Sequence, residues 1–230
     1  MSIYAISDLH LPLSADKPME VFGRSWDNYT ERLRDNWQSV VLPSDTVLIP
    51  GDVSWAMYIK NAFRDFDYIE KLNGRKIISK GNHDYWWETV KKLGDFTQKN
   101  GFCSIDFLHN NAFPVENSAI CGTKGYPAAG INPKSLTGDE ARHYSRELNR
   151  LEISILAAKK LNADRIIAML HYPPGEDTEF SEMLKEHGVS LCVYGHLHGR
   201  TQANAVEGVR GGVMYKLVSC DYMEFMPYLL

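Results

Sequence analysis

Two histidines, His196 and His198, stand two residues apart directly after the apolar run Val193-Tyr194. On an extended backbone, residues two apart share a face and lie roughly 6.5–7 Å from each other. That separation is long for one small ion, but it suits two ions about 3.5–4 Å apart, each bound by one imidazole. The pair therefore suggests a metal site, although two solvated histidines would explain the spacing when it is taken alone.

Four other segments place similar residues directly after short apolar runs. Strands are predicted near residues 2–7, 46–50, 75–79, 164–170 and 189–194. The residues that follow these strands are, in order, Asp8 and His10, Asp52, Asn82-His83-Asp84, His171, and His196 with His198. Open α/β sheets bind ligands beyond the carboxyl ends of their strands. These side chains are therefore expected to meet at one edge of a sheet.

The types of donor atom in these segments narrow the choice of metal. Mixed carboxylate and imidazole donors favour Mn, Fe, Zn or Co over Mg or Ca. No cysteine lies among them, which argues against a structural zinc site. Asp52 stands alone after its strand, so it is the candidate to bridge two ions. Glycines at positions 51, 81 and 195 allow the backbone to approach an ion or a phosphate closely.

The alternation of apolar runs with helical patterns predicts an α/β fold that forms one domain over residues 1–230. Helices are predicted at about 27–41, 56–72, 85–98 and 137–162. Residues 103–123 are typical of a meander of short strands rather than of βαβ units, and a closing hairpin is expected from 202–207 and 212–220. The Gly- and Pro-rich loop 124–136 is a candidate rim or lid for a substrate site.

Composition excludes several classes of protein. The chain has 230 residues, a net charge of −4 and no block of Lys and Arg, so stable nucleic-acid binding is not expected. No apolar run reaches the roughly 20 residues of a membrane span, and a strand pattern begins where a signal peptide would lie. The four cysteines are far apart and suggest buried thiols. These features predict a cytoplasmic protein.

The ordered blocks D-x-H, GD, GNHD, H and GHxH, from Asp8 to His198, resemble those of the calcineurin-like metallophosphoesterase superfamily. The stretch GDVSWAM at 51–57 further resembles a bacterial subgroup of small predicted phosphohydrolases. The resemblance implies an α/β, four-layer αββα sandwich of two mixed β-sheets. It also implies two transition-metal ions, with manganese expected first and iron, zinc or cobalt as alternatives.

The same resemblance implies a role for each residue of the site. One ion would take Asp8, His10, Asp52 and His198, and the other would take Asp52, Asn82, His171 and His196. His83 would be a histidine near the scissile bond that binds no metal, and Asp84 would orient its ring.

The expected reaction is hydrolysis of a phosphoester in a small phosphorylated substrate. A hydroxide that bridges the two ions would attack phosphorus, and His83 would act as general acid. Two alternatives remain open from the sequence: a phosphodiesterase or nuclease that uses the same site, and a metal-binding scaffold without activity. The sequence does not predict the oligomeric state.

Three further features have two interpretations each. Lys124 and Arg200 are candidates to bind phosphate, or they are ordinary surface charges. The run Tyr85-Trp86-Trp87 would stack on a nucleobase or, as is more common at the start of a helix, belong to the core.

Overall fold

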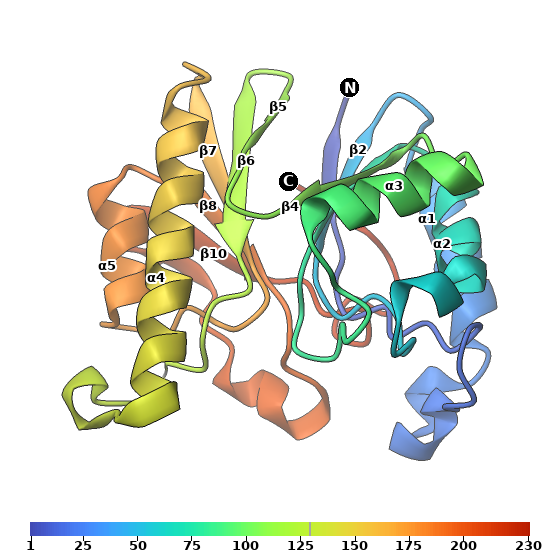
Figure 1. The fold of residues 1–230 in the computed structure, drawn as a ribbon, viewed down its shortest axis with the longest axis horizontal. Coiled ribbons are helices and arrows are strands. Elements are labelled where there is room, and N and C mark those ends of the chain that lie inside the picture. Colours follow the sequence, from blue (N-terminus) through green and yellow to red (C-terminus); the bar gives the residue numbers. More distant parts are fainter. Residues whose placement is uncertain (129) are drawn as a thin grey trace.

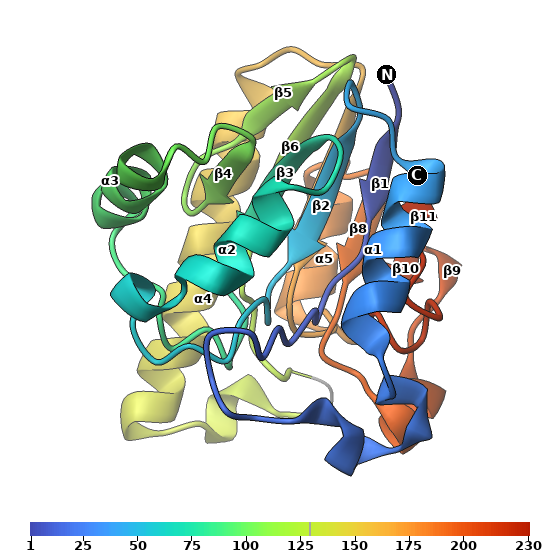
Figure 2. The same ribbon diagram turned by 90° about the vertical axis from the view of Figure 1, so that its right-hand side faces the viewer.

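In the computed structural model, which describes residues 1–128 and 130–230, two mixed β-sheets pack face to face. Helices α1 (Tyr29–Val40), α2 (Phe63–Glu70) and α3 (Val90–Asn100) cover the first sheet, and α4 (Gly138–Lys159) and α5 (Glu179–Glu186) cover the second (Figure 1). Figure 2 shows α1 and α2 in front of the strands that they cover. The predicted four-layer sandwich is confirmed.

Both sheets have a parallel centre; the first has one antiparallel edge strand and the second has two. The first has the order β11 (Tyr228–Leu229), β1 (Ile3–Ala5), β2 (Thr46–Pro50), β3 (Arg75–Ser79) and β4 (Ile105–Leu108). The second has the order β5 (Phe113–Val115), β6 (Ser118–Thr123), β7 (Arg165–Leu170), β8 (Leu191–Tyr194), β10 (Val213–Leu217) and β9 (Gly208–Arg210). In the first sheet β1 to β4 are parallel, and in the second β6, β7, β8 and β10 are parallel. The five strands predicted to precede the metal-binding residues are confirmed.

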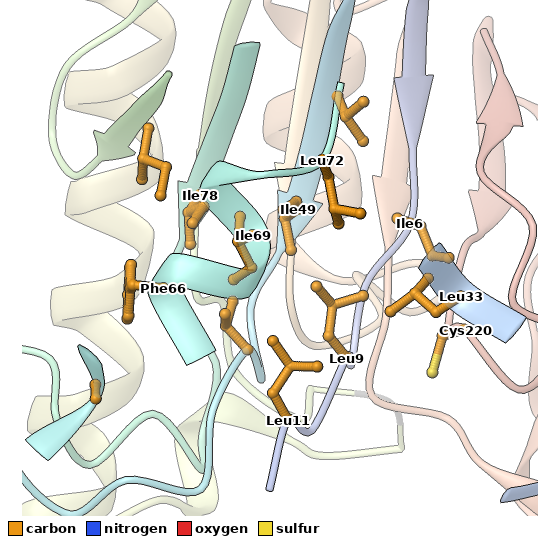
Figure 3. Packing of buried hydrophobic residues seen from close by; sticks show 14 of the residues in the cluster. Ile6, Leu9, Leu11, Leu33, Ile49, Phe66, Ile69, Leu72, Ile78 and Cys220 are labelled. Atoms are coloured by element: carbon orange, nitrogen blue, oxygen red, sulfur yellow. The ribbon is translucent and has the colours of Figure 1, made fainter. Parts of the chain in front are cut away.

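The alternating direction of side chains along the strands explains how each sheet packs against helices on one face and against the other sheet on the other. Successive side chains on a strand point to opposite faces. Val47 and Ile49 belong to the core between the first sheet and its helices, whereas Leu48 packs between the two sheets. Figure 3 shows Ile49 near Ile69 of α2, and Leu33 of α1 near Ile6. Each central strand is therefore buried on both faces, as expected for parallel sheets covered by other layers.

The segment 103–123 differs from its prediction as a meander. β4 lies parallel to β3 and is reached through α3, so these elements form a βαβ unit. Only β5 and β6 form a hairpin, and it belongs to the other sheet. The chain thus passes from the first sheet to the second after Leu108. The local pattern of apolar and polar residues does not encode this, because it depends on pairing between strands far apart in the sequence.

Several other predicted element boundaries differ from those in the structure. The predicted helix 56–72 is divided into the 3₁₀ helix η3 (Ile59–Asn61) and α2, and the helix predicted at 85–98 begins only at Val90, after its Thr89 cap. The predicted strand 202–207 lies largely in the 3₁₀ helix η5 (Gly199–Asn204), and the hairpin that closes the sheet joins β9 and β10. The helix α5 was not predicted.

The remaining expectations concern the loop, the cysteines and the membrane. The predicted loop 124–136 contains the 3₁₀ helix η4 (Pro133–Ser135), and its residue 129 lies outside the described residues. All four cysteines are free thiols, but Cys103 is exposed rather than buried. Within the described ranges, no helix has the length and apolar character needed to cross a membrane.

A buried lysine, Lys76 on β3, closes the end of α2. Its side chain is fully buried, and Nζ donates hydrogen bonds to the main-chain oxygens of Leu72 at 2.6 Å and Gly74 at 2.9 Å. Burial lowers the pKa of Lys76 to about 8. The ammonium group thus provides hydrogen-bond donors for main-chain carbonyls of the turn that follows α2.

We expect this lysine to make stability depend on pH. Because the folded protein releases the Lys76 proton at a lower pH than the unfolded chain, stability rises as the pH rises through this range. Between about pH 8 and about pH 9.5, the free energy of unfolding should increase by roughly 1–2 kcal/mol more in the wild type than in Lys76→Met. Urea unfolding measures this, with the exposed Lys71→Met as the control; a difference that does not change with pH contradicts the prediction.

Candidate metal centre

The predicted metal-binding residues meet at the carboxyl ends of the parallel strands. In Figure 1 the arrow of β6 points downward, toward this end of the sheets. Two groups of side chains have metal-binding atoms that all lie within 4.8 Å of one another. One group is Asp8, His10 and His198, and the other is Asp8, Asp52 and His171. Of these residues only His198 is partly exposed. Asp8 is the carboxylate that both groups share.

Asp52, the predicted bridging residue, belongs to the second group and also lies close to His10 of the first. Its Oδ2 is 3.4 Å from Nε2 of His171 and 3.8 Å from Nε2 of His10. That oxygen is buried and has no hydrogen-bond partner among the described residues. A buried carboxylate oxygen without a donor is costly unless a cation compensates it, so this atom fits a metal ion.

Asn82 and His196 lie on the His171 side of the centre. Oδ1 of Asn82 is 2.6 Å from Nε2 of His171, so both atoms can face the same ion. The His196 ring is 5.1 Å from the His171 ring, centre to centre, but His196 belongs to neither of the two groups. The structure therefore brings six predicted ligands into close contact and places the seventh beside them.

Burial and neighbouring charges shift the pKa values of these residues in different directions. Burial lowers the pKa of His10 and brings that of His171 to about 3, which favours the neutral imidazole that binds metals. Burial opposes ionisation of Asp8, but His198, His171 and His10 hold its pKa well below the usual range. Burial and the neighbouring carboxylates of Asp84 and Asp8 raise the pKa of Asp52. Divalent cations would offset this concentration of buried negative charge.

The backbone is strained at the candidate ligands. Asp8, His10, Asp52 and His196 have φ values of 59°, 45°, 53° and 72°, in the left-handed region that side chains other than glycine rarely adopt. Each such residue costs of the order of 1–3 kcal/mol and persists only where the surroundings enforce it. Such strain is typical of functional sites.

Two glycines allow the close packing around the carboxylates. A Cβ atom at Gly81 would collide with the carboxylate of Asp52, and one at Gly195 would collide with Asp8 and Ser7. These glycines are therefore needed for space rather than for a left-handed φ. The close neighbours of Gly81 and Gly195 are thus side chains of the protein, and the approach of an ion or a phosphate to these glycines stays a prediction.

The two predicted catalytic residues do not interact as expected. The carboxylate of Asp84 accepts hydrogen bonds from the main-chain N–H of Asp52 at 2.9 Å, Val53 at 2.8 Å and Gly81 at 2.7 Å. Among the described residues, no hydrogen bond joins it to Nδ1 of the His83 ring, which is buried without a partner. The predicted role for Asp84 is thus wrong: it fixes the two ligand-bearing turns instead of orienting the His83 ring.

His83 itself is half-buried beside the two groups. Its main-chain N–H donates to Oδ1 of Asp52 at 2.8 Å, and its ring centre lies 5.7 Å from that of His10 and 4.8 Å from that of Trp55. Burial, followed by the charge of Lys17, lowers the pKa of His83. The ring is therefore next to the centre without belonging to either metal-binding group.

A supporting segment after β10 was not predicted. Oδ1 of Asp221 lies 2.8 Å from Nδ1 of His198, and the hydroxyl of Ser219 donates to Oδ2 of Asp8 at 3.1 Å. Although burial opposes it, Asp8 and Asp221 raise the pKa of His198 to about 10. A carboxylate that orients a metal-binding histidine in this way is common in metal sites. The signal was the same strand-end rule, which applies to residues 219–221 as well.

The remaining candidates occupy different positions. Lys124 is half-buried, with Nζ 5.7 Å from the Tyr172 ring centre next to His171, whereas Arg200 is exposed on η5. Trp86 and Trp87 are buried in the core, as their interpretation as core residues predicted. Tyr85 is exposed, and its ring centre lies 6.2 Å from that of His83.

We expect Asp221→Asn to weaken the binding of Mn²⁺ about 10- to 100-fold, because an amide cannot supply the negative charge that supports His198. Calorimetric titration of the metal-free protein with MnCl₂ measures this affinity. Asp139→Asn, the same change at an exposed position of α4, is the control. Equal affinities of wild type and Asp221→Asn would show that Asp221 does not support the centre.

The sequence profile described as "Calcineurin-like phosphoesterase" matches residues 1–200. Among solved structures, the protein of unknown function AQ665 from Aquifex aeolicus has 19% identity and a TM-score of 0.52, with 99% of this chain and 95% of that chain covered. Phosphopantetheinyl hydrolase from Mycobacterium tuberculosis has 12% identity and a TM-score of 0.55, with 100% and 95% covered. TT1561 of Thermus thermophilus has 12% identity and a TM-score of 0.55, with 93% and 86% covered.

At these identities the solved structures share the fold alone. A comparison with curated proteins finds no significant match. The family profile, in contrast, spans most of the chain and every segment that contributes to the two metal-binding groups. The chain therefore belongs to the calcineurin-like phosphoesterase family and is a phosphoester hydrolase.

Proposed function

We propose that the protein hydrolyses a small phosphorylated molecule and requires two metal ions. Asp8, His10, Asp52 and His198 would hold one ion, and Asp52, Asn82, His171 and His196 would hold the other. The observation that carries this proposal is the pair of buried Asp/His groups that share Asp8. The uncompensated Oδ2 of Asp52, close to His171 and to His10, supports a bridging position for that carboxylate.

Two bound ions would supply Lewis acidity toward the phosphoryl oxygens and would lower the pKa of a coordinated water. Manganese is the proposed metal, because it accepts both the carboxylate and the imidazole donors present. The four free cysteines suit a reducing compartment, and the cytoplasm is accordingly the proposed location.

His83 is the proposed general acid. Its ring lies beside the metal-binding groups, and its Nδ1 has no partner in the described residues that would hold it in another role. Burial favours the neutral ring, but the negative charge of a bound phosphoryl group favours the protonated one. The imidazolium would then donate its proton to the departing alkoxide oxygen. Asp84 contributes indirectly, by fixing the turn that carries His83 against the turn that carries Asp52.

We expect different defects from two substitutions in this site. Asp52→Asn removes the central carboxylate charge, so it should abolish both metal loading and turnover. His83→Ala should retain the metal and reduce kcat about 10²- to 10⁴-fold, since only proton transfer is lost. Elemental analysis after dialysis and turnover of p-nitrophenyl phosphate with Mn²⁺ measure the two effects.

His143→Ala, at an exposed position of α4, is the matched control and should retain both metal and rate. Full activity of Asp52→Asn would overturn the two-metal proposal, and full activity of His83→Ala would overturn the role of the acid. Comparison of p-nitrophenyl phosphate with bis(p-nitrophenyl) phosphate distinguishes a monoesterase from a diesterase. A metal-loaded wild type that hydrolyses neither would contradict the proposed reaction.

A further inference from the structure

A cavity of about 310 Å³ opens directly beside the metal centre. His10, His83 and His198 form one of its walls. A phosphoryl group bound at the metal-binding residues would therefore have this cavity next to it. Because His83 is the proposed proton donor, the alcohol that leaves phosphorus must start close to this wall.

The other side chains of the lining, here called the aromatic wall, are mainly apolar and aromatic. Met19, Trp26 and Trp55 line it and are only 3%, 3% and 7% exposed, whereas Phe22 stands at the rim with 61% exposure. Nε1 of Trp55 donates to Sδ of Met19 at 3.2 Å. The Trp55 ring also stacks on His10, with ring centres 4.7 Å apart. Packed side chains thus hold most of this wall in place.

Charge in the cavity is limited. No Lys or Arg lines it within the described residues, and its one carboxylate, Asp221, is already engaged by His198 and Gln202. One cation lies close by but outside the lining: Nζ of Lys17 is 3.5 Å from the centre of the Trp55 ring. Without a basic side chain, the cavity offers no partner for a second phosphate or a carboxylate. It suits a neutral group with a flat apolar surface.

A second hollow lies on the other side of the centre but lacks the acid. It has a volume of about 590 Å³ and is lined by His196, Pro127 and Pro173 among others, with His83 absent from the described lining. A leaving group placed there would be remote from the proposed proton donor. The position of His83 thus distinguishes the two hollows.

We propose that the 310 Å³ cavity binds the leaving group, and that the substrates are phosphoesters of neutral aromatic alcohols. This inference rests on the proposed function, because it takes His83 as the acid. Hydrolysis breaks the ester P–O bond; water supplies the new oxygen on phosphorus, and the departing oxygen receives a proton through His83. The neutral alcohol is then released from between the imidazole wall and the aromatic wall. In Figure 1, the blue segment that carries Met19 and Trp26 and the orange η5 lie at the same lower edge.

Phe22 tests the aromatic wall with little risk to folding, because it is largely exposed. For Mn²⁺-loaded protein, the ratio of kcat/KM for 1-naphthyl phosphate to that for ethyl phosphate should fall about 5- to 10-fold in Phe22→Ala, mainly through KM, since an aromatic contact is lost. Val21→Ala should keep the wild-type ratio, because Val21 is its neighbour in η1 (Met19–Phe22), is 74% exposed and does not line the cavity.

A binding measurement tests the cavity without turnover. Ser25 lines the cavity at an exposed position, so Ser25→Trp should fill the space. Calorimetric titration of the metal-free protein with 1-naphthol should show binding to the wild type and to Val21→Ala. The affinity should be at least about fivefold weaker in Phe22→Ala and in Ser25→Trp.

The outcomes separate this inference from the proposed function. Hydrolysis of both esters by the wild type, with the same ratio in Phe22→Ala and Ser25→Trp, would overturn the leaving-group cavity and leave the proposed reaction standing. Equal affinity of all variants for 1-naphthol would overturn it as well. Absence of turnover of every ester by the metal-loaded wild type would overturn both.

Discussion

The carboxylate of Asp8 is the constraint on which the arrangement of the two sheets depends. It is completely buried, and it accepts hydrogen bonds from the hydroxyls of Ser7 and Ser219 and from the main-chain N–H of His196. Ser7 follows β1 of the first sheet, whereas Ser219 and His196 follow β10 and β8 of the second. A buried carboxylate is costly unless it accepts hydrogen bonds and a positive charge lies nearby. The need to keep these hydrogen bonds therefore restricts how the two sheets can be placed relative to each other. The same bonds that join the sheets therefore aim Asp8 at the metal-binding histidines.

Several residues of the centre have backbone conformations that are unfavourable for side chains other than glycine. Asp8, His10 and Asp52 have left-handed φ values, so the chain alone would not hold these turns. Bonds from distant parts of the sequence enforce them: Asp84 accepts hydrogen bonds from the main-chain N–H of Asp52 and Val53, and the main-chain N–H of His10 donates to the oxygen of Asp52. Asp84, which was predicted to act on the His83 ring, serves the geometry of the centre in this indirect way. The packing and hydrogen bonds of the two sheets thus stabilise the strained backbone of these residues at the strand ends.

The sequence predicted those features that depend on neighbouring residues. A short apolar run followed by Asp, Asn or His is a local pattern, and it identified the five central strands and the candidate ligands after them. The pairing of β4 with β3, the partners of Asp84 and the contact of Asp221 with His198 depend on residues far apart in the chain. No local pattern encodes such pairings, so the meander and the role of Asp84 were predicted wrongly. The strand-end rule extended to residues 219–221 would have pointed to Asp221 but not to its partner.

The residues proposed to bind metal and those that line the proposed leaving-group cavity come from different kinds of structure. The candidate ligands lie at strand ends, where two sheets fix them, whereas Met19, Phe22 and Trp26 lie in 3₁₀ turns between β1 and α1. A connection of this kind carries few of the bonds that hold the sheets together, so its sequence can change while the centre is retained. Trp55 links the two parts, because it stacks on His10 and lies against His83. Residues at the strand ends would then catalyse the reaction, and residues in the connection between β1 and α1 would determine which alcohol is accepted as leaving group.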